Sequence, residues 1–169
     1  MNEKILVVHY SRTGHTRRVA QEIAATLRAN IEEIVDPENR LGLLGYLRSG
    51  RQAFFGQEAD IREPLKDPAG YDLVIVGTPV WNWSLSAPVR AYLARRQQRC
   101  ARTAVASFLT EGGSGEQRVF RQMEELTGKA PLDVMAVREA DLESGRYHDK
   151  IRDFAQSLMD RLGKIHAAA

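Results

Sequence analysis

The chain has 169 residues, 43% of them hydrophobic, and 24 basic and 22 acidic residues give it a formal net charge of +2. This length supports one sizeable core and is short for two, so we expect a single domain over residues 1–169. The charges are spread along the chain rather than gathered in a basic block, which argues against a nucleic-acid partner. The lone Cys100 excludes an intramolecular disulfide.

Metal and membrane signals are missing from the sequence. No C-x-x-C or H-x-x-x-H spacing offers a structural metal site, and we predict no bound metal. No apolar run approaches membrane-spanning length, and the N-terminus lacks the pattern of a secretory signal. We therefore expect a cytoplasmic protein with no membrane partner.

Strand and helix patterns alternate in the N-terminal half. Residues 5–9 form a β-branched apolar run typical of a strand buried on both faces. Apolar residues then recur at helical spacing over 19–27, and runs at 31–35 and 71–77 predict two more strands. Between them, residues 40–56 mix large apolar side chains with glycines. This segment is either a helix that covers the sheet or an exposed surface for a partner or a dimer.

The alternation continues in the C-terminal half. A helix is predicted after Pro88, a residue suited to a first helical turn. Strand patterns at 103–109 and 132–137 are each followed by a helical pattern, over 119–126 and 151–162. Such alternation predicts right-handed crossovers and a parallel sheet. The predicted fold class is therefore α/β, a doubly wound sheet of about five parallel strands with helices on both faces.

Three segments follow predicted strand ends, where open parallel sheets bind their ligands. The first places hydroxyls and a glycine at a helix N-terminus, a position that favours a phosphate monoester. Its residues are Ser11, Arg12, Thr13, Gly14, His15 and Thr16. It lacks the spacings typical of ATP- and NAD-binding loops. The alternative is simple helix capping by Ser11 or Thr13.

The other two segments are suited to a flat ring. The second carries both tryptophans of the chain around an asparagine, which favours a planar ligand over core packing. Its residues are Thr78, Pro79, Val80, Trp81, Asn82 and Trp83, of which Asn82 best tolerates a positive φ. The third is rich in glycine, so its backbone can approach the edge of a heterocycle, or it is only a flexible turn. Its residues are Thr110, Glu111, Gly112, Gly113 and Gly115.

With these motifs in this order, the chain resembles the flavodoxin family. The matching features are S-x-T-G-x-T at 11–16, G-T-P-x-W at 77–81 and the Gly-rich loop at 111–115. The resemblance implies a three-layer fold with strand order 2-1-3-4-5 and one non-covalently bound FMN. It also implies that residues 11–16 hold the phosphate, 79–83 line the isoalloxazine and 110–115 close over its pyrimidine edge. The flavin would do the chemistry, and no catalytic side chain is predicted.

The chain departs from that family in its charge. Family phosphate loops are generally uncharged, whereas this one contains Arg12 and His15, and electron-carrying flavodoxins are typically acidic. Arg12 is either solvated or turned toward the phosphate. Our hypothesis is that the reduced flavin is less disfavoured here than in such carriers. Elsewhere, His9 is interpreted as a packing residue or a proton donor, and residues 141–148 as a solvated loop.

Three functions fit these patterns. The first is an FMN-binding redox protein that transfers electrons to a partner protein. The second is an FMN-dependent reductase that uses NAD(P)H and a small quinone, so whether the chain is an enzyme stays open, as does monomer against homodimer. The third is a flavin-free regulatory module, but a phosphate-accepting receiver domain requires acidic residues where His9 and Tyr10 stand.

Overall fold

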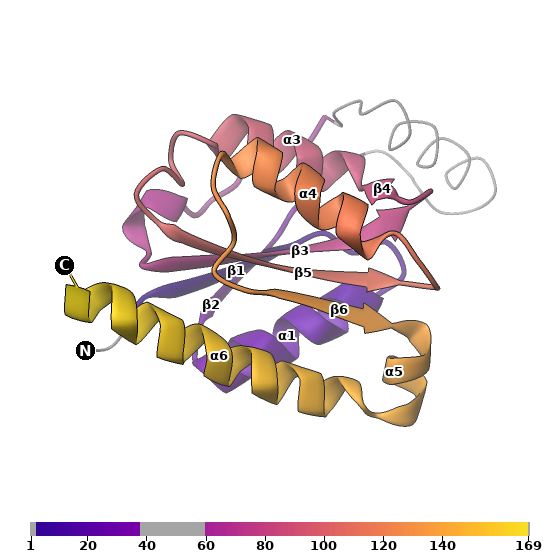
Figure 1. The fold of residues 1–169 in the computed structure, drawn as a ribbon. Coiled ribbons are helices and arrows are strands. Elements are labelled where there is room, and N and C mark those ends of the chain that lie inside the picture. The colour runs from indigo at the N-terminus through magenta and orange to yellow at the C-terminus, as the bar shows by residue number, and fades with distance from the viewer. Residues whose placement is uncertain (1–2, 38–59, 169) are drawn as a thin grey trace.

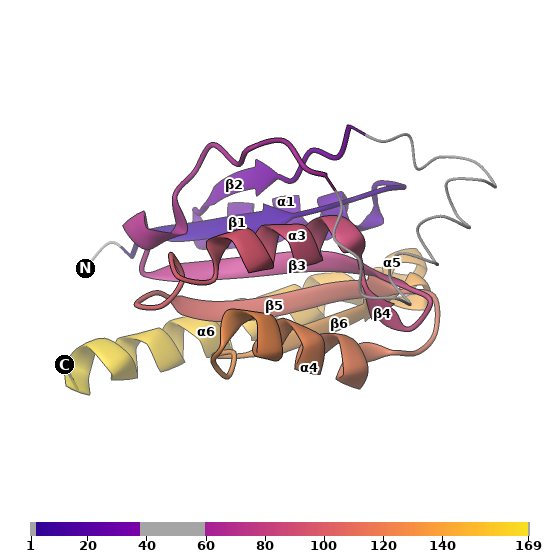
Figure 2. The same ribbon diagram turned by 90° about the horizontal axis from the view of Figure 1, so that it is seen from above.

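The strands predicted from the sequence lie in one sheet. The computed structural model describes residues 3–37 and 60–168, so the segment at 40–56 lies outside the described residues. The sheet order is β2-β1-β3-β5-β6, and all four pairings along it are parallel (Figures 1 and 2). These strands are β1 (Ile5–His9), β2 (Asn30–Glu33), β3 (Leu73–Trp81), β5 (Ala104–Glu111) and β6 (Val134–Arg138). The predicted parallel order is confirmed.

Helices cover both faces of this sheet. Helices α1 and α6 lie on one face, and α3 and α4 on the other (Figure 1). The helical elements are α1 (His15–Leu27), η1 (Pro68–Gly70), α3 (Ala87–Arg96), α4 (Glu116–Thr127), α5 (Glu139–Ser144) and α6 (Tyr147–Ala168). Each face has its own buried cluster, and successive residues of β1 alternate between them, with Val7 in one and Val8 in the other. The apolar runs follow from this burial on both faces.

The second predicted segment, which was expected to follow the end of its strand, is instead largely part of that strand. β3 continues through Pro79 to Trp81 and then folds back as β4 (Ser84–Leu85), an antiparallel partner that adds a sixth strand to the sheet. The two turn residues, Asn82 and Trp83, have φ of 47° and 56°. Two positive φ values define the type I′ turn that suits a two-residue hairpin. The tolerance of Asn82 for a positive φ is confirmed, whereas no positive φ was predicted at Trp83.

The solvated loop predicted beyond the last strand is also wrong. Residues 139–144 form the short helix α5, and α6 begins at Tyr147. Asp141 and Tyr147 are buried, with exposed fractions of 5% and 2%. Charged pairing at Asp141 and packing of Tyr147 against the α1 side of the core account for the difference.

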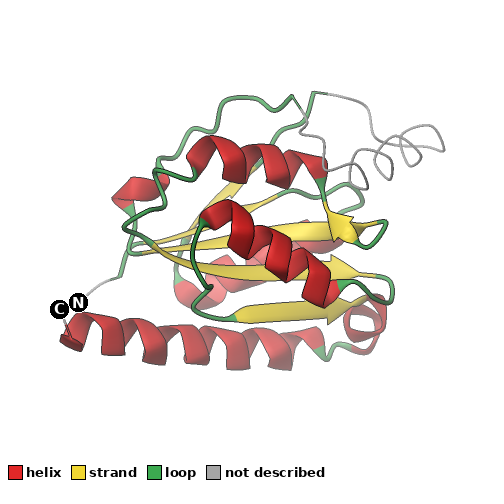
Figure 3. Cartoon of the chain, turned by 45° about the horizontal axis from the view of Figure 1, so that its top comes forward, coloured by secondary structure: helices red, strands yellow, loops and turns green. Residues whose placement is uncertain are grey.

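The carboxyl ends of the parallel strands lie together at one end of the molecule (Figure 3). The described N- and C-terminal residues lie at the opposite end, where His166 Nδ1 is 3.2 Å from Glu3 Oε1 (Figure 1). No helix in the described part of the chain is long and apolar enough to span a bilayer.

Candidate active site

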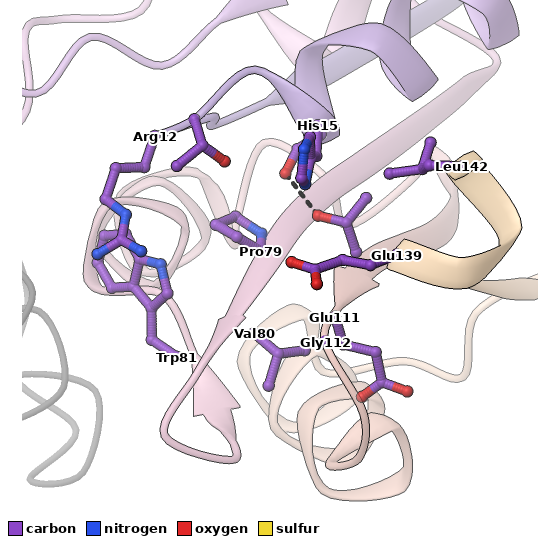
Figure 4. A pocket seen from close by; sticks show the side chains of 12 residues that line it. Arg12, His15, Pro79, Val80, Trp81, Glu111, Gly112, Glu139 and Leu142 are labelled. Carbon is purple, nitrogen blue, oxygen red and sulfur yellow. Dashed lines mark hydrogen bonds between the residues drawn. The ribbon is translucent and has the colours of Figure 1, made fainter.

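A pocket opens at the carboxyl ends of the strands (Figure 4). Four segments of the chain form it: the β1–α1 loop, the end of β3, the end of β5 with the residue after it, and α5. Its lining residues are Arg12, Thr13, His15, Thr16, Pro79, Val80, Trp81, Thr110, Glu111, Gly112, Glu139 and Leu142. The structure therefore brings the three predicted segments together and adds a fourth.

The β1–α1 loop presents backbone donors to this pocket. Gly14 is the N-cap of α1 with a φ of 101°, and no side chain caps the helix. Ser11 Oγ accepts a hydrogen bond from the Gly14 N–H at 3.1 Å and so closes the loop instead of capping the first turn. The amides of the first turn thus remain available to an anion, and this donor set fits a phosphate.

A buried hydroxyl pair joins this loop to β5. Thr16 Oγ1 and Thr110 Oγ1 are 2.8 Å apart, and both residues are buried. The bond holds the first turn of α1 against the end of β5 (Figure 4). Two of the predicted segments are therefore fixed to each other from within.

Aromatic side chains form one wall of the pocket. The Arg12 guanidinium carbon lies 5.8 Å from the centre of the Trp81 ring, and Tyr10 meets the same indole edge-on at 5.5 Å. Trp81 is only 6% exposed. Arg12 is thus half-buried with its guanidinium over an aromatic face, and so is not fully solvated.

The hairpin and the Gly-rich loop contact each other beside the pocket. Trp83 Nε1 donates to Ser114 Oγ at 3.0 Å, while the indole stays 58% exposed. Gln122 of α4 accepts from the Leu85 N–H at 2.8 Å and so ties the hairpin to that helix. The two segments are therefore supported as a unit, although Trp83 does not itself line the pocket.

Some predicted site residues lie behind the pocket surface or beside it. They are Ser11, Gly14, Thr78, Asn82, Trp83, Gly113 and Gly115. Thr78 is fully buried and shares a 2.9 Å hydrogen bond with Ser86 Oγ. A cofactor role stays a prediction for all the predicted site residues, in the lining and beside it.

Glu111 is a buried carboxyl group at the end of β5. Its side chain is 1% exposed, Oε1 lies 3.5 Å from Arg138 Nε, and within the described residues Oε2 has no hydrogen-bond partner. Burial, with Glu116 nearby, raises the pKa of Glu111 above its usual value. In Figure 4 this side chain points away from the centre of the pocket.

Glu139 and Leu142 were not predicted as site residues from the sequence. Glu139 follows β6 directly, so the rule that ligands bind beyond strand ends would have included it. A helix as short as α5 shows too little periodicity to be recognised, and nothing in its residue types marked it as part of a site.

His9 lies under the loop rather than in the pocket. Its ring is buried, and neither ring nitrogen has a hydrogen-bond partner among the described residues. Burial lowers the pKa of His9 to about 4, against the opposing influence of Glu33, whose Oε2 lies 4.0 Å from His9 Nε2. A neutral packing residue fits this geometry better than a proton donor.

Comparison with known proteins gives one family and a set of similar folds. Residues 4–160 match the model of a family described as NADPH-dependent FMN reductase. No curated protein matches the chain in sequence.

The fold is similar to those of several solved structures. A flavoprotein from Lactobacillus acidophilus NCFM, solved in complex with FMN, is 22% identical with a TM-score of 0.70, covering 84% of this chain and 97% of its own. A protein from Bacteroides eggerthii DSM 20697 is 20% identical with a TM-score of 0.74, covering 93% and 98%. Two-electron reduced flavodoxin from Megasphaera elsdenii is 17% identical with a TM-score of 0.59, covering 91% and 97%. These likenesses establish the flavodoxin-like fold.

Proposed function

The chain belongs to the NADPH-dependent FMN reductase family, and we propose that it binds one FMN in the pocket of Figure 4 and reduces a small quinone with electrons from NAD(P)H. FMN is the cofactor of its redox function. The observation that carries the proposal is the loop at 11–16, whose uncapped helix amides open into the same pocket as the aromatic wall at Trp81. A phosphate and a flat ring would be held at the two ends of that pocket.

Each segment would have a separate task. The amides that follow Gly14 would bind the phosphate, and His15, which lines the pocket in the first turn of α1, offers a ring N–H beside them. Pro79, Val80 and Trp81 would exclude water from one side of the ring. Bound FMN supplies the electron-transfer chemistry, and the protein supplies position and electrostatics.

A carrier function is the second candidate, and one observation favours it. Trp83 exposes 58% of its surface at the tip of the β3–β4 hairpin, beside the pocket. Exposed aromatic side chains of this kind are enriched where proteins dock. A redox protein that docks there would receive electrons at the edge of the cofactor.

The test has two stages. The visible spectrum of the purified protein, followed by titration of the colourless form with FMN, measures cofactor binding. NADPH oxidation with a small quinone is then followed in the absence of any other protein. Saturable FMN binding with unaided turnover supports the reductase. FMN binding without turnover, restored by a partner reductase, replaces it with the carrier, and failure to bind FMN contradicts both.

A further inference from the structure

The fourth segment of the pocket has no role in the function proposed above. Helix α5 follows β6 and contributes Glu139 and Leu142 to the lining. Leu142 is 8% exposed and belongs to the buried cluster on the α1 side of the sheet. Glu139 is exposed and places a carboxylate in the pocket.

A buried carboxylate fixes the position of α5. Asp141 accepts hydrogen bonds from the Arg138 N–H at 3.0 Å, from Lys150 Nζ at 2.6 Å and from Arg146 Nε at 3.2 Å. These donors lower the pKa of Asp141 to about 2, so it stays ionised. Glu139 therefore extends from an anchored helix and not from a loose loop.

The Glu139 carboxylate lies in the middle part of the pocket. Figure 4 shows it directed inward between His15 and Val80. Its Oε2 is 3.9 Å from the point where a Cβ on Gly112 would stand. Over residues 3–37 and 60–168 it has no hydrogen-bond or ion-pair partner, so its acceptor sites are available to a ligand.

The charges of the pocket indicate which part of a ligand reaches this carboxylate. His15 and the first turn of α1 make one end suitable for a phosphate, whereas the Arg12 guanidinium lies over Trp81. The aromatic wall at Trp81 suits the ring. The part of FMN between phosphate and ring is a chain of hydroxyl groups, and hydroxyls are donors that a carboxylate accepts.

We propose that Glu139 binds the hydroxylated chain of FMN by accepting hydrogen bonds from its hydroxyl groups, and so selects flavins that carry this chain. The inference rests on the proposed function, because it requires FMN in this pocket. It assigns to the β6–α5 segment the recognition of the chain, as a complement to the three segments that would hold phosphate and ring.

Three flavins separate the contacts. The protein freed of flavin is titrated with FMN, with riboflavin, which lacks the phosphate, and with lumiflavin, which lacks both phosphate and hydroxylated chain. Dissociation constants come from flavin fluorescence. The substitution Glu139→Leu is expected to weaken FMN and riboflavin alike by about tenfold, the low end for hydrogen bonds to a charged group. Lumiflavin binding is expected to stay within about twofold. Glu139→Gln, which keeps an acceptor oxygen, is expected to lose only about threefold.

The control is Glu143→Leu on the same helix, an equal change of charge at an exposed residue outside the pocket lining. It is expected to leave all three constants unchanged. Unchanged FMN and riboflavin constants in Glu139→Leu overturn the inference. Equal weakening of lumiflavin overturns it in favour of a ring contact, and tighter FMN with unchanged riboflavin overturns it in favour of phosphate repulsion. If the unsubstituted protein binds no FMN, the proposed function itself fails.

Discussion

At the scale of single residues, Gly77 sets the distance between β3 and a ring in β5. A Cβ at Gly77 would lie 2.0 Å from Phe108 Cζ, which is buried ring carbon with little room to move. We expect Gly77→Ala to lower the free energy of unfolding by about 3 kcal/mol, the upper range for overpacking a core. Urea unfolding measures this. Gly70→Ala, with nothing within 4 Å of the new Cβ, is the control, and equal effects of the two would contradict the prediction.

His9 makes stability depend on pH. The pKa of His9 is about 4 in the folded protein against its ordinary value of 6.5, so the unfolded chain binds the proton first as the pH falls. The contribution of neutral His9 to the free energy of unfolding should therefore be fully present above about pH 6.5. About 2 kcal/mol of it should be lost by about pH 5. Arg17 and Glu33 are the charged groups facing the ring.

His9→Phe removes this titration while keeping a buried ring. Urea unfolding of both proteins at about pH 7.5 and about pH 5 gives the comparison. The difference in stability between the two pH values should be smaller in His9→Phe by about 2 kcal/mol. Identical differences would show that the ring titrates near its ordinary pKa.

The residue types of the first loop were readable from sequence, but their geometry was not. The S-x-T-G-x-T spacing located the helix N-terminus and its glycine at Gly14. That Ser11 closes the loop depends on a rotamer that the spacing does not encode, and that Arg12 lies over Trp81 depends on a contact between residues 69 positions apart. Glu139 directly follows β6, so the strand-end rule could have found it, although not the inward direction of its side chain.

At the scale of elements, α5 depends on the charges that hold Asp141. Asp141→Ala leaves three donors without their acceptor, and we expect a loss of about 2 kcal/mol, below the range for fully buried pairs because Lys150 and Arg146 are partly exposed. FMN should also bind more weakly, because the α5 wall of the pocket loses its anchor. Thermal unfolding and FMN titration measure the two effects.

Asp149→Ala is the matched control for this prediction. Asp149 and its partner Arg152 are both about seven-tenths exposed, and exposed pairs contribute little. The control should change neither stability nor FMN affinity appreciably. If Asp141→Ala behaved like Asp149→Ala, α5 would be held by Leu142 packing alone.

Most elements were predictable from their patterns, whereas the extension of β3 into the β4 hairpin and the short helix α5 were not. The apolar runs of β1, β3 and β5 and the helical stripes of α1, α4 and α6 were all located from sequence. The extension of β3 was hidden by Pro79, which usually demotes a strand. The sheet accommodates Pro79 because this residue lies past the central part of β3, where its paired neighbour is at the end of β5. Six residues of α5 give too little periodicity to be detected.

At the scale of the whole molecule, the order of the sheet decides where the site lies. β1 sits between β2 and β3, so connections from β1 and β3 diverge to opposite faces and leave a crevice at their carboxyl ends. The alternating elements predicted this architecture from the sequence, and the site follows from it. The folded structure was needed to show which side chains after β6 point into that crevice.

The balance of charge leads to a prediction about redox behaviour. The chain carries a net charge of +2, and Arg12 lies over the Trp81 wall of the pocket. We expect Arg12→Gln to weaken reduced FMN relative to oxidised FMN by about fivefold, because a nearby cation favours the more negative state. Potentiometric titration measures the shift toward lower potential. Arg121→Gln, an exposed position on α4 outside the pocket, removes equal charge and is the control.

The two tryptophans have optical consequences. Trp81 is nearly enclosed beside the ring site, whereas Trp83, two residues on, is mostly in water at the hairpin tip. Their emission should therefore divide into a blue-shifted component, which energy transfer to a bound flavin would suppress most strongly, and a red-shifted component accessible to iodide. One emission spectrum of the unlabelled protein would thus report separately on what fills the pocket and on what covers its rim.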